Sequence, residues 1–232
     1  MSVDAVVMAA GEGRRLRPLT ERWAKPVLPL DGEPVILHLL RDLAAASVRR
    51  VWVVTGHHAE QVEALVGDGS AFRLDLRTVR QPRADGSADA VRRAVAAGAE
   101  PPLLVCAADT RFAAGDVGRI AALDAEAALA VRRAPPPPPG AAVLVQDGHV
   151  RKVIDPDPDN RLGGAPLWLL GPRVTTLLDA LPGPPFELAT ALQRAIDAGV
   201  PVMALEVGPT RDLTTPFDVL ERNFPYLADL PR

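Results

Sequence analysis

The sequence predicts an α/β fold built on a mainly parallel sheet. Short, apolar, β-branched runs such as Val3–Met8 and Arg50–Thr55 are typical of parallel strands that are buried on both faces. Segments with apolar residues three and four positions apart, such as Glu33–Ala46, separate these runs and predict helices. Strands and helices that alternate in this way predict a sheet with helices on both faces.

The first half of the chain follows this alternation. Its expected strands are apolar or alternating runs: Val3–Met8, Arg50–Thr55, Phe72–Val79, Pro102–Cys106 and Ala127–Val131. Its expected helices have an apolar face or are rich in alanine: Glu33–Ala46, His58–Val66, Ser87–Ala97 and Ala114–Glu126. Helical connections between strands are typical of parallel pairing.

The pattern changes in the second half. Asp147-Gly148 separates the strand segments Ala141–Val145 and His149–Ile154, and this dipeptide predicts a two-residue hairpin turn. Pro166–Leu170 is expected to pair with that hairpin. The remaining elements are two helices, a strand and a last helix: Val174–Ala180, Phe186–Ala198, Val202–Val207 and Thr215–Leu227.

These elements predict one domain of 232 residues. We divide it into a core at 1–134, a hairpin-bearing insertion at 135–200, and a returning strand and helix at 201–232. The run Pro135–Pro139 is stiff and extended, so it either connects the core rigidly to the insertion or binds a partner.

The amino-acid composition disfavours several classes of protein function. The chain is 48% apolar and 24% charged with a net charge of −3, which is typical of a globular protein and offers no broad positive field for nucleic acid or an anionic membrane. No apolar run approaches the roughly 20 residues that span a bilayer. The single cysteine, Cys106, excludes a disulfide framework and favours a reduced, cytoplasmic location.

A glycine-rich, basic loop follows the first expected strand. The segment VVMAAGEGRRLRPLTERWAKPVLPL, at 6–30, contains Gly11, Gly13, four arginines and Lys25. Glycines let backbone N–H groups approach a phosphate closely. The P-loop pattern is not met, and Leu16 occupies the position of the third glycine of the dinucleotide fingerprint, so a dehydrogenase is disfavoured.

Lys25 is unusual in this chain because only Lys25 and Lys152 are lysines among 26 basic residues. A lysine offers a compact point charge where an arginine offers a flat fork. Lys25 either occupies a narrow site or reflects compositional bias alone.

The loop resembles the signature A-A-G-x-G-x-R-L-x-P-L-T of the sugar-1-phosphate nucleotidyltransferases. The match covers 9–20 and continues at Lys25-Pro26, while Arg14 stands where the family usually has a small residue. Gln81-Pro82 and Gly86-Ser87 resemble the family's Q-P…G-T-A segment. The resemblance implies a short, single-domain member with a Rossmann-like nucleotidyltransferase fold.

The resemblance also implies a reaction. A sugar 1-phosphate would attack the α-phosphorus of a nucleoside triphosphate and release pyrophosphate, a step that needs positioning and charge neutralisation. Arg15 would hold the β- and γ-phosphates, and Lys25 would lie between the α-phosphate and the acceptor phosphate. The expected nucleotide contacts are Ala10, Gly11, Gly13, Gln81, Gly86 and Ser87.

Two aspartates are implied as metal ligands. The segment LLVCAADT resembles a strand end that presents a metal-binding aspartate, here Asp109, and RDLTTPFDVLERN resembles the segment that carries a second one, here Asp212. Mg²⁺ takes one or two carboxylates plus phosphate oxygens, so we expect Mg²⁺ as the cofactor. Asp109 as a helix cap and Asp212 as a turn or cap residue are the alternatives.

The segment that is expected to bind the acceptor resembles the family less closely than the glycine-rich loop does. The E-K-P motif is reduced to Asp155-Pro156, with Lys152 three residues earlier, while Gly163-Gly164 resembles a glycine that lies along the sugar. Asp155 and Gly164 are therefore the expected acceptor contacts. A cytidylyltransferase for a non-sugar phosphate such as phosphocholine and a non-catalytic relative that binds nucleotide sugar stay open. The base, the acceptor and the oligomeric state are also open.

Overall fold

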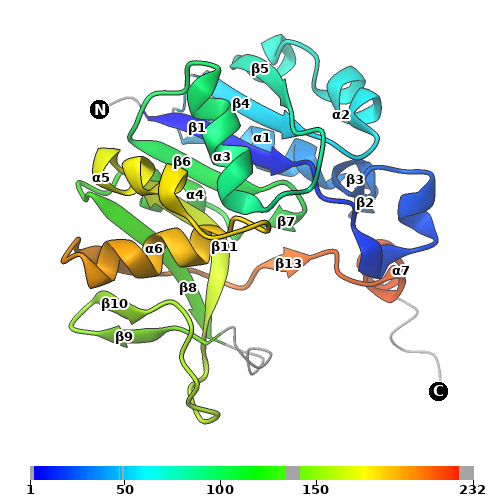
Figure 1. Cartoon of the computed structure of the whole chain (residues 1–232). Coiled ribbons are helices and arrows are strands. Elements are labelled where there is room, and N and C mark those ends of the chain that lie inside the picture. Colours follow the sequence, from blue (N-terminus) through cyan, green and yellow to red (C-terminus); the bar gives the residue numbers. More distant parts are fainter. Residues whose placement is uncertain (1–2, 47, 49, 134–141, 225–232) are drawn as a thin grey trace.

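A nine-stranded sheet forms the centre of the protein in the computed structural model, which describes residues 3–46, 48, 50–133 and 142–224 (Figure 1). The expected Pro135–Pro139 connector lies outside the described residues. The strands, in order across the sheet, are β5 (Asp75–Arg80), β4 (Arg50–Thr55), β1 (Asp4–Ala9), β6 (Leu103–Ala107), β11 (Leu162–Leu170), β8 (Ala127–Arg133), β12 (Val202–Glu206), β10 (His149–Lys152) and β9 (Leu144–Gln146).

The sheet is mainly parallel, as predicted. β5, β4, β1 and β6 run parallel to one another, and β8 runs parallel to β12. The strand β11 lies between these two groups and is antiparallel to both of its neighbours.

The predicted pairing of Pro166–Leu170 with the hairpin is wrong. These residues belong to β11 and pair with β6 and β8 instead. Leu167 and Leu170 are both fully buried and belong to the cores on opposite faces of the sheet. A strand that is apolar on both faces is stable in the middle of a sheet, whereas β9 and β10 lie at its edge.

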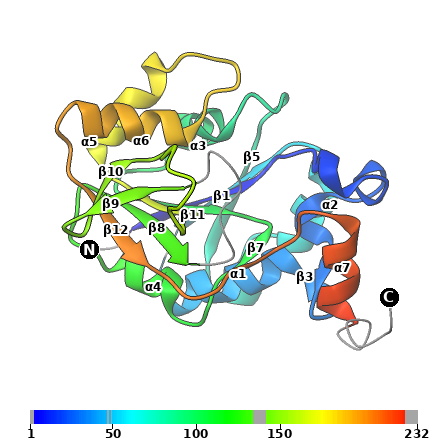
Figure 2. The same ribbon diagram turned by 90° about the horizontal axis from the view of Figure 1, so that it is seen from below.

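Helices cover both faces of the sheet, which confirms the predicted α/β fold. These helices are α1 (Val35–Ala45), α2 (Ala59–Val66), α3 (Ser87–Ala96), α4 (Asp116–Ala121), α5 (Pro172–Thr175) and α6 (Leu188–Asp197), while α7 (Pro216–Asn223) packs beside β2. The helices α1, α2 and α4 pack in one core, and α3, α5 and α6 pack in the other (Figure 2). In α1, the residues Ile36, Leu39, Leu40 and Leu43 form one apolar stripe.

Strand residues alternate between the two cores. In β1, Ala5 and Val7 belong to the core of α1, and Val6 belongs to the core of α3. Successive side chains of a strand point to opposite faces, so burial on both faces requires a continuous apolar run. Among the described residues, no helix combines the length and the apolarity that crossing a bilayer would need.

Aspartate-glycine dipeptides form two hairpin turns. Asp147 and Gly148 have φ values of 51° and 73° and join β9 to β10, as predicted. Asp31 and Gly32 have φ values of 56° and 81° and join β2 (Pro29–Leu30) to β3 (Glu33–Pro34). The second hairpin was not predicted, although it carries the same signal.

A separate pair of short strands joins the segment after β6 to the segment after β12. It consists of β7 (Thr110–Arg111) and β13 (Arg211–Asp212), which are antiparallel. β7 follows β6 in the chain, so its pairing with β13 places the segment around residue 212 beside the end of β6.

Candidate active site

A cavity of about 400 Å³ opens at the carboxyl ends of β1 and β6. Ligands of open α/β sheets bind outside the carboxyl ends of parallel strands. Nine of the twelve predicted site residues line the cavity: Ala10, Gly11, Gly13, Arg15, Lys25, Gln81, Gly86, Ser87 and Asp109. The other three, Gly164, Asp155 and Asp212, do not line it.

The glycine loop folds back on itself at Gly13. Its φ of 61° is left-handed, and an added Cβ would lie 2.9 Å from Cγ2 of Thr20. The hydroxyl of Thr20 donates to the carbonyl of Gly13 at 2.9 Å, and Leu16 is fully buried. These contacts hold the backbone on both sides of Arg15, whose exposed side chain lines the cavity.

The neighbouring Arg14 is exposed and forms an ion pair with Glu12. Its Nε donates to Glu12 Oε2 at 2.7 Å, and this hydrogen bond lowers the pKa of the Glu12 carboxyl. Both residues belong to the loop itself, so the contact stiffens it locally.

Lys25 and Asp109 form an ion pair within the cavity lining. Lys25 begins a short 3₁₀ turn at 25–27, directly after Ala24. The side chain of Gln61 fixes this approach, because its Oε1 accepts from the N–H of Ala24 at 2.8 Å and its Nε2 donates to the carbonyl of Arg22 at 2.8 Å. The lysine is therefore held by the helix α2 and faces a carboxylate at the end of β6.

Gln81 and Gly86 line the cavity from the segment that follows β5. Gly86 has a φ of 108°, and an added Cβ would lie 2.3 Å from the carbonyl oxygen of Phe186. Only glycine fits that backbone and that contact. Gln81 is 5% exposed, and its Nε2 donates to Gly86 O at 3.1 Å and to Asp89 Oδ2 at 2.9 Å.

Ser87 connects the cavity wall to α6. Its hydroxyl donates to Glu187 Oε2 at 2.6 Å and accepts from the N–H of Leu188 at 2.9 Å. The hydroxyl is thus occupied in joining the start of α3 to the start of α6, while the residue lines the cavity.

Asp212 lies beside Asp109 through the β7–β13 pair. Asp212 pairs with Thr110, the residue that follows Asp109, and the N–H of Leu213 donates to the carbonyl of Asp109 at 3.4 Å. Arg132 of β8 binds Oδ2 of Asp212 at 3.0 Å. The other oxygen, Oδ1, is buried and has no hydrogen-bond partner among the described residues.

This arrangement fits a divalent cation. A buried carboxylate oxygen without a partner is costly unless a ligand satisfies it. Carboxylate oxygens are ligands that Mg²⁺ accepts, and this ion takes its other ligands from phosphate and water. In the part of the chain that the structure describes, no group of three or more His, Cys, Asp or Glu side chains forms a metal site.

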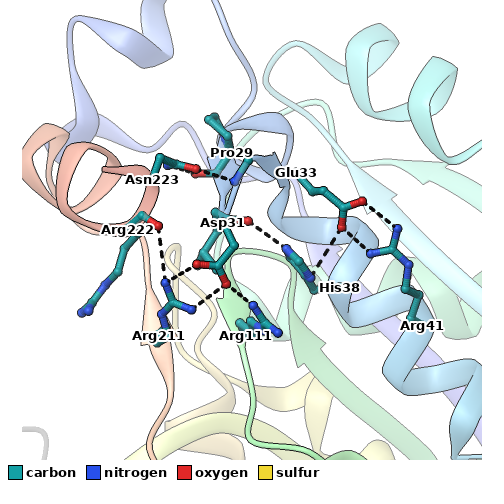
Figure 3. A network of polar contacts seen from close by, with 11 residues as sticks. Pro29, Asp31, Glu33, His38, Arg41, Arg111, Arg211, Arg222 and Asn223 are labelled. Atoms are coloured by element: carbon teal, nitrogen blue, oxygen red, sulfur yellow. Dashed lines mark hydrogen bonds and ion pairs between the residues drawn. The ribbon is translucent and has the colours of Figure 1, made fainter. Parts of the chain in front are cut away.

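Asp31 braces the β7–β13 pair from outside the cavity (Figure 3). Both of its oxygens accept from Arg211, at 2.6 and 2.7 Å, and Oδ2 also binds Arg111. The hydrogen bonds from Arg211 lower the pKa of the Asp31 carboxyl, so Asp31 stays ionised. Asn223 of α7 binds the same turn, because it accepts from Gly32 N–H at 2.7 Å.

Asp155 and Gly164 lie outside the cavity lining. Asp155 is 7% exposed, and its Oδ2 accepts from Asn160 Nδ2 at 2.8 Å, so the carboxylate holds its own loop. Gly164 lies in β11 opposite Val131. An added Cβ at Gly164 would lie 3.5 Å from Cγ2 of Val143.

Sequence reasoning did not find Asp31, Gln61 or Asp89, which position the predicted residues. The dipeptide Asp31-Gly32 was a visible hairpin signal. No signal in the sequence identifies the partners of Gln61 or the contact between Asp89 and Gln81, because these contacts depend on how loops fold against helices. His57 also supports the loop, since its Nε2 donates to the carbonyl of Thr20 at 2.6 Å.

The chain is similar to known nucleotidyl transferases. The nucleotidyl transferase family model matches residues 4–133. A glucose-1-phosphate thymidylyltransferase from Streptomyces antibioticus is 30% identical over 98% of this chain and 67% of its own length. A mannose-1-phosphate guanylyltransferase from Mycobacterium tuberculosis is 46% identical over 34% of this chain and 22% of its own length. The chain spans about two thirds of the length of the Streptomyces relatives.

A solved structure shares the fold. A Bacillus anthracis protein described as a glucose-1-phosphate thymidylyltransferase, in complex with sucrose, superposes with a TM-score of 0.85 at 19% identity. The superposition covers 100% of this chain and 97% of that one. From the family match and the full-length relative, the chain belongs to the sugar-1-phosphate nucleotidyltransferase family of enzymes.

Proposed function

We propose that the protein transfers a nucleotidyl group from a nucleoside triphosphate to a sugar 1-phosphate, forming a nucleoside-diphosphate sugar and pyrophosphate. One observation carries the proposal: the lining of a single cavity brings together Arg15, Lys25 and Asp109 with Gln81 and Gly86. The first group suits phosphates, and the second suits a planar base beside a close-packed backbone.

The reaction joins an oxygen of the sugar phosphate to the α-phosphorus. The bond from the α-phosphorus to the bridging oxygen breaks, and pyrophosphate leaves with that electron pair. Arg15 would bind the β- and γ-phosphates through its fork. Lys25 would neutralise charge where the α-phosphate meets the acceptor phosphate, which requires it to exchange part of its contact with Asp109 for phosphate oxygens.

We assign Asp109 and Asp212 as the residues that would hold Mg²⁺. The partnerless Oδ1 of Asp212 and the carboxylate of Asp109 supply the hard oxygen ligands that this ion prefers. When bound, Mg²⁺ would neutralise phosphate charge as a Lewis acid. Arg132 would keep the Asp212 side chain oriented, because it binds the other carboxylate oxygen.

The acceptor side is assigned to the segment 135–200, with Asp155 and Gly164 as proposed contacts. Asp155 would act by shaping its loop, since its carboxylate is bound to Asn160. The half-buried Trp168 of β11 offers a flat apolar face for a sugar ring. Phosphocholine would need an aromatic or acidic cage, and the chain is only 4% aromatic. We therefore favour a hexose 1-phosphate.

The proposed reaction also indicates which partners the enzyme needs and where in the cell it acts. The substrates are a nucleoside triphosphate and a sugar 1-phosphate, and neither a nucleic acid nor a membrane is required. The thiol of Cys106 is fully buried, and burial raises its pKa, so the sulfur is unreactive. We place the enzyme in the cytoplasm, where these phosphorylated substrates are available.

The test is a screen for pyrophosphate release. UTP, dTTP, GTP, CTP and ATP are each combined with glucose-1-phosphate, mannose-1-phosphate, an N-acetylated hexosamine 1-phosphate and phosphocholine, with Mg²⁺ present. Release with a sugar phosphate, and its loss in Lys25→Ala, is expected. Release with phosphocholine alone would identify the cytidylyltransferase-like alternative. Nucleotide-sugar binding without release in any pair would identify the non-catalytic alternative.

A further inference from the structure

Two histidines immediately before α2 bind the segment that follows the glycine loop. Nε2 of His57 donates to the carbonyl of Thr20 at 2.6 Å, and Nε2 of His58 donates to the carbonyl of Glu21 at 3.2 Å. A carbonyl oxygen only accepts hydrogen bonds, so each of these ring nitrogens carries a hydrogen. The two rings lie side by side, with centroids 4.0 Å apart, and together they bind two successive backbone carbonyls.

The contact of His57 continues through Thr20 to the turn at Gly13. Thr20 is 1% exposed, and its hydroxyl donates to the carbonyl of Gly13 at 2.9 Å. The N–H of Leu16 donates to the same carbonyl at 2.8 Å. The imidazole therefore fixes the backbone of Thr20, and the side chain of Thr20 fixes the left-handed turn of the glycine loop.

His57 also binds the residue that precedes the loop. Its backbone N–H donates to the carbonyl of Ala10 at 3.2 Å. The preceding residue, Gly56, packs so closely that an added Cβ would lie 2.7 Å from that carbonyl oxygen. Glycine is the residue that allows two backbone segments to approach in this way. One residue thus contacts both ends of the glycine loop, Ala10 before it and Thr20 after it.

These contacts occupy carbonyl groups of the loop and leave its N–H groups for a ligand. The carbonyls of Ala10, Gly13 and Thr20 all accept hydrogen bonds. In contrast, none of the N–H groups of residues 11–15 has an acceptor in the part of the chain that the structure describes. Successive free N–H groups around a left-handed residue form a site for anions. Gly13 and Arg15 line the cavity, so a phosphate group that binds there can meet these donors.

We propose that His57 positions the glycine loop for a pyrophosphate group, either free or as part of a nucleoside triphosphate. Its side chain holds Thr20, and Thr20 holds the turn at Gly13, so the loop keeps its arrangement before the ligand arrives. A preorganised loop does not have to be ordered on binding, which strengthens binding. His57 is a positioning residue, because it acts through Thr20 and does not line the cavity. This inference rests on the proposed function, since it takes the glycine loop to bind the phosphates of a nucleoside triphosphate.

The test measures how tightly His57→Leu binds inorganic pyrophosphate in the presence of Mg²⁺. Leucine cannot donate to the carbonyl of Thr20, so the dissociation constant should rise about tenfold. Glutamine can place an amide N–H near the position of Nε2, so His57→Gln should bind within about threefold of the unmodified protein. Isothermal titration gives the dissociation constant and, separately, the fraction of molecules that bind.

A merely structural role for His57 gives a different result. In His57→Leu a smaller fraction of molecules would then bind, while the folded molecules would bind with an unchanged dissociation constant. That outcome, or an equal loss of affinity in His57→Gln, would overturn the inference and leave the proposed function standing. If the unmodified protein binds neither pyrophosphate nor any of UTP, dTTP, GTP, CTP and ATP, both proposals fail.

His149→Leu is the matched control. Nδ1 of His149 also donates to a backbone carbonyl, that of Asp147 at 2.8 Å, but His149 belongs to the β9–β10 hairpin and does not line the cavity. Its affinity for pyrophosphate should equal that of the unmodified protein.

A second pair of variants tests the next hydrogen bond if His57→Leu does not fold. Thr20→Val removes the hydroxyl that binds the carbonyl of Gly13 and should lose about tenfold in affinity for pyrophosphate. Thr20→Ser keeps the hydroxyl and should retain the affinity. Equal affinities in these two variants would overturn the inference.

Discussion

Arg111 and Arg211 lie directly opposite each other in the antiparallel pair β7–β13, and the carboxylate of Asp31 binds both guanidinium groups. Like charges at opposed positions of an antiparallel pair repel. Asp31 removes that repulsion, and the next pair along the two strands joins Thr110 to Asp212. A carboxylate on a distant hairpin thereby holds the two proposed metal ligands together.

We expect Asp31→Asn to weaken the response to Mg²⁺. Asparagine tolerates the left-handed φ of this turn, so the hairpin is retained while the charge is lost. Residues that orient metal ligands typically change metal affinity by about 10- to 100-fold. The Mg²⁺ concentration for half-maximal pyrophosphate release should rise by at least about tenfold.

Glu33→Gln is the control for this prediction. Glu33 lies in the same hairpin and binds Arg41, at 2.6 and 3.0 Å, but contacts neither arginine of the β7–β13 pair. Its Mg²⁺ requirement should not change. Equal shifts in both variants would show a general loosening of the hairpin rather than an effect through Asp212.

Arg15→Ala should lower kcat/KM by roughly tenfold to a thousandfold, on the scale of one lost charge-assisted stabiliser of the transition state. Arg17→Ala should have a much smaller effect, because Arg17 is exposed and does not line the cavity. Steady-state kinetics of pyrophosphate release compares the two. Equal losses at both positions would mean that the loop acts by overall charge alone.

Asp109→Asn should abolish Mg²⁺-dependent turnover and leave the fold intact. A neutral amide is a poor ligand for a hard cation, and the same change removes the partner of Lys25. The far-UV circular dichroism spectrum and the thermal midpoint check the fold, while an Mg²⁺ titration checks turnover. A normal titration curve would remove Asp109 from the metal site.

Glu63→Gln should destabilise the protein at neutral pH but not in acid. The Arg80 guanidinium and the buried Thr55 hydroxyl donate to Glu63, and their hydrogen bonds hold the pKa of its carboxyl below its usual value. A lowered folded-state pKa means that the stabilisation is complete above the unfolded-state pKa of about 4.3 and is lost as the pH falls through the folded-state value.

Urea unfolding measures this difference. At pH 7 the variant should be less stable by about 1 kcal/mol. The gap between the two proteins should close as the pH falls below about 4, where the carboxyl of the unmodified protein also becomes protonated. A gap that is constant from pH 7 to pH 3 would show that the charge of Glu63 does not contribute.

The presence of Gly11, Gly13 and Arg15 in one cavity could be predicted because these residues are close together in the chain. Gly11, Gly13 and Arg15 lie on one loop, and the strand before it was recognisable from its apolar run. A local sequence signature indicates both the backbone geometry of the loop and its chemistry. The prediction therefore did not depend on how the rest of the chain folds.

The supporting contacts could not be predicted because they join distant segments. Asp31 and Arg211 are 180 residues apart, and their contact depends on how β13 returns to β7. The site of Asp155 was predicted from a weak motif, and the structure shows its carboxylate engaged with Asn160. Short polar motifs in loops are compatible with many local hydrogen-bond patterns, so they identify partners poorly.

The position of β11 has a consequence for how the chain folds during synthesis. When residues up to 133 have been made, β5, β4, β1 and β6 can assemble, but the far edge of β6 has no partner until Leu162–Leu170 arrives. An open apolar edge recruits other strands and promotes aggregation. The nucleotide-binding half is therefore expected to be insoluble as a fragment that ends at Arg133, and the full sheet is expected to unfold as one cooperative unit.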